Sequence, residues 1–245
     1  MRNADQWKPT RLVKDPRTGE FRLNRARTFG GSLYLAEIQR EAYLPLMRDH
    51  LTGSLMDIGC GPVPYYEVYK DLVTENICLD YPSTLHGKEH LDVLVDLNTD
   101  PVIPFPDGRF DSVLATDMIA HMERPDLFVG ELARVLKPGG KAMITSTFIN
   151  WIGEFPWEYS HPTGPGLRSL AEKAGLEVLH LESYGGHADV LMDTLNKFCP
   201  HGLGNRAFLA FARLVTWTGW PERNRRHTRD RYAIGNTMIA QKPLG

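Results

Sequence analysis

Apolar and polar residues follow one another along the chain in blocks that predict strands alternating with helices. Three apolar runs each end in an aspartate, at Asp57, Asp80 and Asp96. Stretches with apolar residues at helical spacing lie between and after the strand-like runs. Further strands are predicted at 110–115, 141–146, 176–181 and 232–241, and helices at 64–72, 125–136 and 167–174. This alternation predicts an α/β, doubly wound sheet with helices on both faces.

Residues 1–50 precede this alternation. The segment 1–30 is polar and rich in arginine, so we expect an extended arm. A helix should follow to about His50, where Ser32 is suited to capping its start and Pro45 to bending it. We therefore expect an N-terminal arm and helix at 1–50 and one main domain at 51–245, with a helical insertion at about 187–230.

The insertion carries two patterns of its own. Five arginines at 223–231 predict a solvated loop, with phosphate or an anionic membrane surface as the alternative contact. An apolar stripe within 207–220 favours packing in the core or in a homodimer. An interfacial helix that touches a lipid-linked substrate is the alternative for this stripe.

Composition fits a folded domain with an ordinary core. Of the 245 residues 42% are hydrophobic and 24% charged, as in soluble globular proteins. The formal net charge of −2 gives no general reason to expect nucleic acid as a partner. The three cysteines lack metal-ligand spacing, so we expect no metal site and a cytoplasmic setting. We expect neither a signal peptide nor a membrane-spanning segment.

The stretch 55–62 has the pattern of a buried strand that ends at a ligand. Its apolar run reaches Asp57 and then breaks into Gly59, Cys60 and Gly61, and glycines let a backbone approach a bound molecule. A dinucleotide fingerprint would need a third glycine where this chain has Pro64. Asp57 would also repel a pyrophosphate. The turn therefore favours a cationic ligand such as S-adenosylmethionine over NAD.

Asp80 lies at the end of the next strand, about 20 residues beyond the glycine turn. An acid there is suited to hydrogen bonding with ribose hydroxyls. The alternative is that an aspartate at a strand end simply starts a turn. Because successive parallel strands end at the same edge, the glycine turn in front of Asp80 favours ligand binding.

Four motifs in order resemble one family. They are Asp57-Ile58-Gly59-Cys60-Gly61-Pro62, the Asp80 strand end, residues 104–111 and residues 132–140. Together they resemble class I S-adenosylmethionine-dependent methyltransferases of the kind called methyltransferase type 11. The resemblance runs from about 55 to 146 and weakens through 186. It implies a Rossmann-like sheet, mostly parallel, with an antiparallel last strand.

The resemblance also implies a role for each motif residue. Gly59, Cys60 and Gly61 would approach the methionine part of S-adenosylmethionine, with Asp57 near its amino group. Asp80 would bind the ribose. The remaining cofactor positions are Tyr81 beside the adenine, Asp96 and Leu97 at the adenine edge, and Thr116, Asp117 and Met118 at the reactive end.

The methyl acceptor is less defined by the sequence. A hydroxyl acceptor would benefit from a general base, and His121 and His161 are the two candidates. The alternative to a catalytic role for His121 is a structural role in the cofactor pocket or at a helix end. The alternative for His161 is that it is an ordinary surface residue of the loop. Aromatic residues at 148–159 are expected to cover the acceptor or, alternatively, to form a small core under the loop.

We therefore expect transfer of a methyl group from S-adenosylmethionine to a small-molecule acceptor at a hydroxyl oxygen. The insertion and the N-terminal helix would build the acceptor side. The alternatives are methylation of nitrogen or carbon, a macromolecular acceptor, or a non-catalytic subunit that binds the cofactor and supports a partner. The absence of an Asn/Asp-Pro-Pro-Tyr/Phe sequence after 110–115 disfavours a nucleobase or amide nitrogen.

Overall fold

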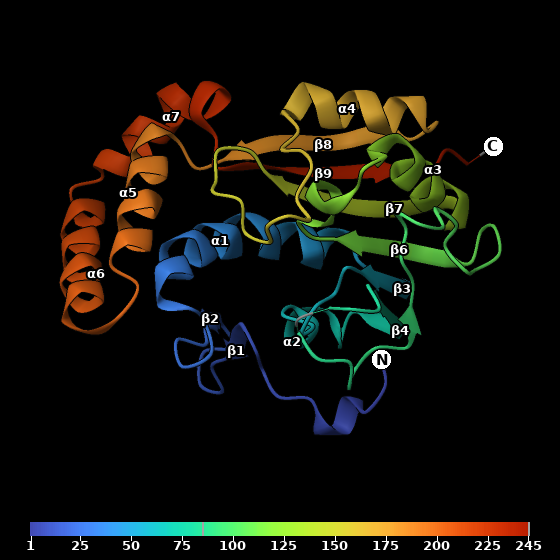
Figure 1. The fold of residues 1–245 in the computed structure, drawn as a ribbon, viewed down its shortest axis with the longest axis horizontal. Helices are drawn as coiled ribbons and strands as arrows, with labels where there is room; N and C mark the ends of the chain where they lie inside the picture. The colour runs from blue at the N-terminus through green and yellow to red at the C-terminus, as the bar shows by residue number, and fades with distance from the viewer. Residues whose placement is uncertain (85, 245) are drawn as a thin grey trace.

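The computed structural model describes residues 1–84 and 86–244, and a seven-stranded sheet lies at its centre (Figure 1). Its strands are β3 (Gly53–Ile58), β4 (Val73–Asp80), β5 (Val93–Leu94), β6 (Phe110–Ala115), β7 (Leu136–Thr147), β8 (Glu177–Tyr184) and β9 (Gly235–Gln241). They are ordered β5-β4-β3-β6-β7-β9-β8. In this sheet β9 runs opposite to the other six strands. The predicted sheet, mostly parallel with an antiparallel last strand, is confirmed.

Helices cover both faces of the sheet. They are α1 (Leu33–His50), α2 (Tyr66–Tyr69), α3 (Pro125–Val135), α4 (Gly164–Lys173), α5 (His187–Phe198), α6 (Gly202–Trp217) and α7 (Trp220–Tyr232), with short 3-10 helices η1 (Ala4–Gln6), η2 (Gly30–Ser32) and η3 (Met118–His121). Contacts with the sheet are made by α3 and α4 on one face and by α1 on the other. Figure 1 shows α5, α6 and α7 gathered at one end of the molecule.

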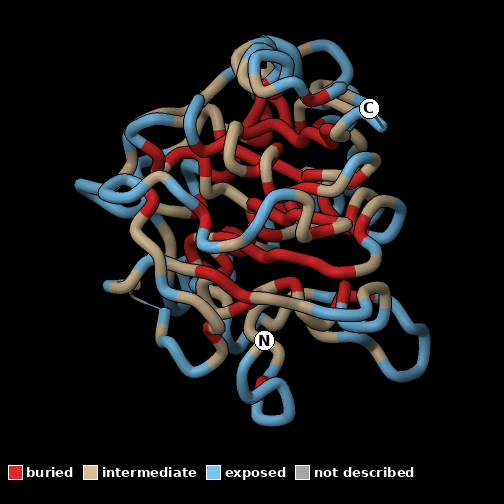
Figure 2. Tube along the Cα trace, turned by 90° about the vertical axis from the view of Figure 1, so that its right-hand side faces the viewer, coloured by how far each residue is buried: buried red, intermediate tan, exposed pale blue. Residues whose placement is uncertain are grey.

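The core lies in two layers because side chains alternate along each strand. Leu55 of β3 packs in the layer under α1, and its neighbour Met56 packs in the layer under α3 and α4. Figure 2 shows the buried backbone running through the middle of the molecule, with exposed loops around it. No helix among the described residues has the length and apolar character that a membrane span requires.

The strand order places a ligand crevice beside β3. The chain moves from β3 outward to β4 and β5, then returns to the other side of β3 as β6. Ligands of open parallel sheets bind outside the carboxyl ends of the strands where the order reverses in this way. The crevice should therefore lie over the ends of β3, β4 and β6.

The N-terminal arm is ordered, in contrast to the expected extended segment. Strands β1 (Leu12–Lys14) and β2 (Phe21–Leu23) form an antiparallel hairpin. Leu12 is fully buried, and the ring of Trp7 packs edge-on against Tyr66 at 5.0 Å. These apolar side chains are widely spaced along a polar segment, so their pattern alone did not predict the packing.

Three local predictions also differ from the structure. The helix expected over 64–72 is a single turn, α2, because Val63 has φ of 52° and its carbonyl accepts from the N–H of Tyr66 in a tight turn before it. Ser32 precedes α1 but its side chain makes no capping hydrogen bond. The arginines at 223–231 lie in the helix α7 and not in a loop. From this helix Arg225 pairs with the buried Asp189.

Candidate cofactor and acceptor site

The turn after β3 is held close to β4 by its backbone. Gly59 and Gly61 have φ of 66° and 51°, which disfavours residues with a side chain. A Cβ on Gly59 would lie 2.4 Å from the sulfur of Met118. The N–H groups of Gly59 and Cys60 donate to the Leu79 carbonyl at 2.9 and 3.2 Å. The glycines are thus required by the turn itself, at the crevice that the strand order defines.

Asp80 ends β4 with its carboxylate turned back to the glycine turn. Oδ2 accepts a hydrogen bond from the N–H of Gly61 at 3.0 Å and from the Thr84 hydroxyl at 3.1 Å. Oδ1 accepts from the N–H of Tyr81 at 2.7 Å. Two carboxylate oxygens offer about four acceptor positions, so capacity remains for a ligand hydroxyl. Asp80 therefore both starts the turn and remains able to bind ribose.

Asp57 is buried just before the turn. The Tyr69 hydroxyl donates to its Oδ2 at 2.6 Å. Burial raises the pKa of Asp57 to about 7, and the nearby Asp80 also raises this pKa, whereas the hydrogen bond from Tyr69 lowers it. Among the described residues no cation pairs with Asp57. The buried hydroxyl of Tyr65 likewise makes no hydrogen bond within the described chain.

These features fit S-adenosylmethionine. Asp57 and Asp80 have no cationic partner among the described residues. The ammonium and sulfonium groups of this cofactor would provide one. The glycine turn is a backbone cradle that a Cβ would fill. An unbonded Tyr65 hydroxyl is suited to a polar ligand group.

The predicted adenine positions are divided between the surface and the core. Tyr81 is 39% exposed beside Asp80, as a residue flanking a planar ring would be. Asp96 accepts from the N–H of Asn98 at 3.1 Å and from the Thr99 hydroxyl at 2.7 Å. Leu97 is buried in the layer under α3. Asp96 thus shapes the turn after β5, and a direct role at the adenine edge stays a prediction.

The segment after β6 connects the glycine turn with a cavity. Thr116 is half-buried, and Asp117 has φ of 56°, so the chain reverses sharply there. Met118 fills the space under Gly59. Asp117 lines the cavity, as does His121 at the end of η3. This short segment therefore touches both the predicted cofactor position and the predicted acceptor position.

A network of polar side chains surrounds Asp117. The Gln39 amide donates to Asp117 at 3.1 Å and to the hydroxyls of Tyr43 and Tyr184 at 3.2 and 3.3 Å. Arg11 donates to the side-chain oxygen of Gln39. Burial raises the pKa of Asp117, while the positive charge of Arg11 and hydrogen bonds from Tyr43, Thr145 and Gln39 lower it.

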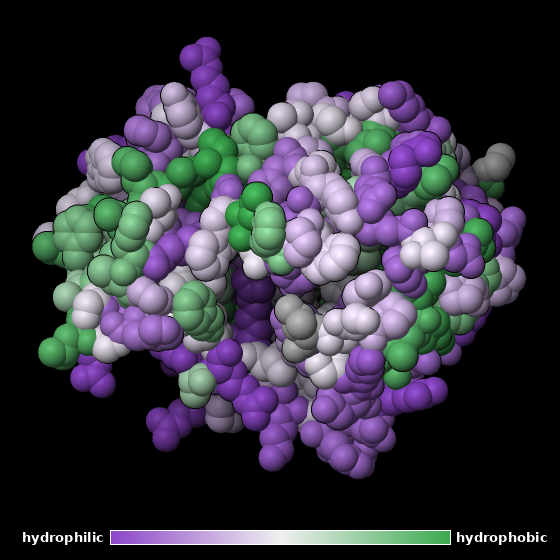
Figure 3. Space-filling view, in the orientation of Figure 1, coloured by the Kyte–Doolittle hydropathy of each residue, from purple (hydrophilic) through white to green (hydrophobic). Residues whose placement is uncertain are grey.

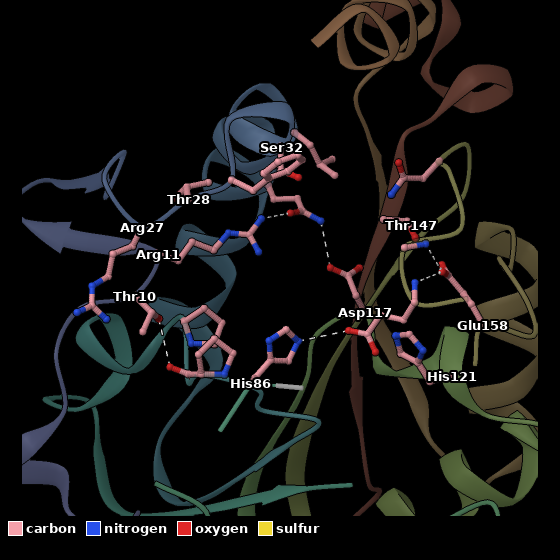
Figure 4. A pocket seen from close by; sticks show the side chains of 18 residues that line it. Thr10, Arg11, Arg27, Thr28, Ser32, His86, Asp117, His121, Thr147 and Glu158 are labelled. Carbon is pink, nitrogen blue, oxygen red and sulfur yellow. Dashed lines mark hydrogen bonds and ion pairs between the residues drawn. The ribbon is translucent and has the colours of Figure 1, made fainter. Parts of the chain in front are cut away.

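The cavity beside Asp117, where the acceptor is predicted to bind, has a volume of about 700 Å³ and is lined mostly by polar residues (Figure 4). One wall comes from the N-terminal arm, with Arg11 and Arg27 among its side chains. The opposite wall comes from the loop after β7, with Glu154 and Glu158. His86 pairs with Glu154 at 3.3 Å, and this hydrogen bond raises the pKa of His86. The pair joins the segment after β4 to the loop.

His121 has one ring nitrogen fixed and one without a partner. Nδ1 lies 2.8 Å from the carbonyl oxygen of Trp157. Because a carbonyl only accepts, Nδ1 carries the proton and Nε2 of the neutral ring carries a lone pair. Nε2 makes no hydrogen bond with another described residue. The predicted base His121 thus lines the acceptor cavity with an available acceptor nitrogen.

His161 is placed differently from the prediction. Its Nδ1 lies 3.1 Å from the Phe148 carbonyl and its Nε2 lies 2.6 Å from Glu158. Both nitrogens are therefore engaged in holding the loop, and His161 is absent from the cavity lining. The structure supports the alternative of a loop residue for His161.

Two expectations about the acceptor side are also corrected. Trp151, Phe155, Trp157 and Tyr159 are largely exposed, and the loop turns polar groups to the cavity. The insertion supports the N-terminal arm from behind: Asn205 donates to the Gly30 carbonyl at 3.2 Å. The arm, which the sequence pattern left unassigned, forms the wall together with the expected N-terminal helix, whose Leu35 and Gln39 also line the cavity.

The comparisons with known proteins agree with this geometry. A family model for a methyltransferase domain matches residues 56–144. The probable tRNA methyltransferase 9B of Mus musculus is 33% identical over 121 residues, 45% of this chain and 26% of its own length. The ubiquinone biosynthesis O-methyltransferase of Bradyrhizobium sp. (strain ORS 278) is 31% identical over 104 residues, 40% of this chain and 41% of its own. The chain therefore spans less than half the length of these curated relatives.

A solved structure shows the same fold. The S-adenosylmethionine-dependent methyltransferase from Archaeoglobus fulgidus superposes with a TM-score of 0.55 at 19% identity, covering 85% of this chain and 93% of that one. The family match and the fold together support a class I, S-adenosylmethionine-dependent methyltransferase. Within the chain, the match to the methyltransferase domain covers residues 56–144.

The raised pKa of Asp57 predicts a pH-dependent stability. Between its ordinary pKa of 3.8 and about 7, folded Asp57 binds its proton more tightly than unfolded Asp57. The contribution of this proton to the stability of the folded state is therefore complete at low pH and is lost as the pH rises to 7. Asp57→Asn removes the buried charge. We expect the variant to be more stable than wild type, and this gain in the free energy of unfolding should be up to about 3 kcal/mol larger at pH 8 than at pH 5. Urea unfolding without the cofactor measures it.

Asp111→Asn is the control of opposite sign. Burial alone would raise the pKa of Asp111, but hydrogen bonds from Lys137 and Ser54 outweigh it and hold this pKa at about 2. The charged form is therefore stabilising at both pH values, so Asp111→Asn should lose stability at both. An Asp57→Asn variant with the same stability difference from wild type at pH 5 and pH 8 would contradict the raised pKa.

Proposed function

We propose that the protein transfers the methyl group of S-adenosylmethionine to a hydroxyl oxygen of a small polar acceptor. The observation that carries this proposal is the free Nε2 of His121 at the cavity wall, three residues beyond Met118 under the glycine turn. The cofactor supplies a methyl group already activated by its sulfonium. The protein then has to bind both molecules, align them and remove one proton.

Each part of that task has residues suited to it. Asp57 and Asp80 hold the positively charged cofactor at the ends of β3 and β4. Nε2 of His121 takes the proton of the acceptor hydroxyl, and the Trp157 carbonyl keeps the ring in the required tautomer. Gln39 and Asp117 fix the floor of the cavity next to the reacting groups.

The acceptor should carry several hydrogen-bonding groups. The cavity wall offers cations at Arg11 and Arg27 and carboxylates at Glu154 and Glu158. Arg27 makes no ion pair with another described residue. A polar acceptor with an anionic group beside Arg27 would match this lining, whereas an apolar acceptor would leave the polar wall without partners.

A second candidate is methylation of an RNA nucleoside. The similarity to a relative named as a probable tRNA methyltransferase favours it. The basic helix α7 is the feature of this chain that would suit an RNA backbone. The polar cavity is compatible with a single nucleoside, so the two candidates are separated by experiment.

Release of S-adenosylhomocysteine from S-adenosylmethionine is the direct test. Purified protein is incubated with pools of hydroxyl-, amine- and thiol-bearing small molecules, and in parallel with total RNA. We expect turnover with a hydroxyl pool, and mass spectrometry should place the added methyl group on oxygen. Turnover confined to amine pools or to RNA would replace the proposal with the corresponding alternative.

A further inference from the structure

An apolar face lies open to solvent at the end of the molecule formed by α5 and α6. It consists of Phe198, Leu203, Phe211, Leu214 and Trp217. The largest exposed fractions are 79% for Phe198, 80% for Leu203 and 85% for Trp217. Figure 3 shows hydrophobic side chains gathered on the side where Figure 1 places α5 and α6. Monomeric soluble proteins rarely expose such a cluster without a partner.

This face is distinct from the side by which α6 packs on the protein. Asn205, Phe208 and Ala212 are buried at helical spacing and turn inward. The spacing of 203, 207, 210, 214 and 217 places a second apolar stripe on the opposite side of the helix. Core packing explains the first stripe and leaves the second without a role in the described chain.

The charges around this face are predominantly positive. Residues 197–232 hold eight Lys and Arg against two Asp and Glu, and three of these cations pair with Asp193, Asp189 and Glu182 outside the segment. A formal charge of +3 remains, in a chain whose total is −2. Arg206 and Arg213 flank the apolar stripe on α6, both exposed. Neither makes an ion pair with another residue that the structure describes. An apolar stripe bordered by arginines is the pattern of a helix lying in a lipid interface.

The apolar face is also linked to the acceptor side. Lys197, next to Phe198, donates to Asn150 at 2.8 Å and lies 5.5 Å from the ring centre of Trp151. Asn150 lines the acceptor cavity, and the exposed Trp151 extends the apolar surface toward it. On the other side, Leu203 and Arg206 line a smaller cavity that shares Thr28 with the acceptor cavity.

We propose that this apolar face docks the protein on an anionic lipid bilayer. The positive charge favours this occupant, because a second copy of the chain would bring two positively charged regions together. An RNA would leave Leu203 and Leu214 in water. Docking inserts the five apolar side chains among the acyl chains and places the arginines at the lipid headgroups. It also holds the cavity next to the membrane surface. The inference does not depend on which acceptor is methylated.

Vesicle sedimentation tests the proposal on the full chain. We expect wild type to sediment with vesicles of phosphatidylcholine and phosphatidylglycerol, far less with phosphatidylcholine alone, and less as salt is raised. The variant Leu203→Ser/Leu214→Ser/Trp217→Ser should lower the partition coefficient at least about tenfold. Arg206→Gln/Arg213→Gln should lower it on the anionic vesicles alone. Brominated lipids should quench the tryptophan fluorescence of wild type but much less that of the triple variant.

Matched surface changes keep the test specific. Leu94→Ser/Val102→Ser/Leu127→Ser removes three partly exposed apolar residues elsewhere and should leave sedimentation unchanged. Equal thermal unfolding of all variants excludes misfolding as the cause. The proposal is overturned if wild type does not bind anionic vesicles or if both triple variants bind equally. It is also overturned if light scattering shows that wild type is a dimer and that the serine variant of the apolar face is a monomer. Binding of the apolar face to RNA in preference to vesicles would overturn it as well.

Discussion

Asp80→Asn is expected to weaken the binding of S-adenosylmethionine by about 10- to 100-fold. The one acceptor position left on the carboxylate can take one ribose hydroxyl, and a hydrogen bond to a charged group is worth about 1.5 to 3 kcal/mol. The variant also replaces Oδ2, which accepts from the N–H of Gly61, with a donor. Calorimetric titration of the purified protein with S-adenosylmethionine measures the change.

Thr84→Val is the matched control for this prediction. It removes the hydroxyl that donates to Oδ2 of Asp80 at 3.1 Å but keeps the carboxylate. We expect a loss of affinity of about fivefold or less. Affinity should further rise in wild type as the pH passes 7, because Asp57 then becomes ionised opposite the cationic ligand. An Asp80→Asn protein that binds within threefold of wild type would remove the ribose role from Asp80.

The cofactor side of the site could be predicted from the sequence because its signals are local. Strand β6 begins and ends at the predicted residues, 110 and 115, and the glycine turn follows β3 as expected. Each of these elements is encoded in fewer than about ten consecutive residues, by alternation and by glycine. The strand order then follows from general rules of parallel sheets, which bring Asp57 and Asp80 to one edge.

The acceptor side could not be predicted in the same way because its residues meet only in the folded chain. Arg11, Gln39 and Tyr184 come from a hairpin, a helix and an edge strand, and hydrogen bonds join Gln39 to each of the other two side chains. Each is an ordinary polar residue within its own segment. The sign that a sequence offers is weak: Gln39 and Tyr43 are polar on the buried side of an otherwise apolar helix stripe.

The two histidines show where a residue type misleads without geometry. His121 lies a helical turn beyond Asp117 and His161 lies in the aromatic loop after 141–146, so the sequence offers both as candidates for the base. The structure separates them by their partners: His161 is bound at both nitrogens, whereas His121 is bound at Nδ1 alone. Protonation chemistry needs a free nitrogen, so the prediction of a base now falls on His121.

His121→Gln is therefore expected to lower kcat with a hydroxyl acceptor by about 10² to 10⁴-fold, the usual contribution of a positioned general base. Glutamine retains a side chain of similar length that can donate to the Trp157 carbonyl, so the loop should keep its position. The affinity for S-adenosylmethionine should stay within about threefold, because the cofactor contacts lie at the ends of β3 and β4. Steady-state kinetics with the acceptor found by the screen, and titration with the cofactor, measure the two effects separately.

His161→Gln distinguishes proton transfer from loop support. His161 joins the Phe148 carbonyl to Glu158, so its replacement should lower the melting temperature and raise KM through a loosened loop, with kcat within about fivefold of wild type. The reverse pattern, with kcat lost in His161→Gln and kept in His121→Gln, would move the base to His161. An acceptor that is already ionised at the assay pH has no proton to give. If His121→Gln loses as much kcat with such an acceptor, His121 positions the acceptor and takes no proton.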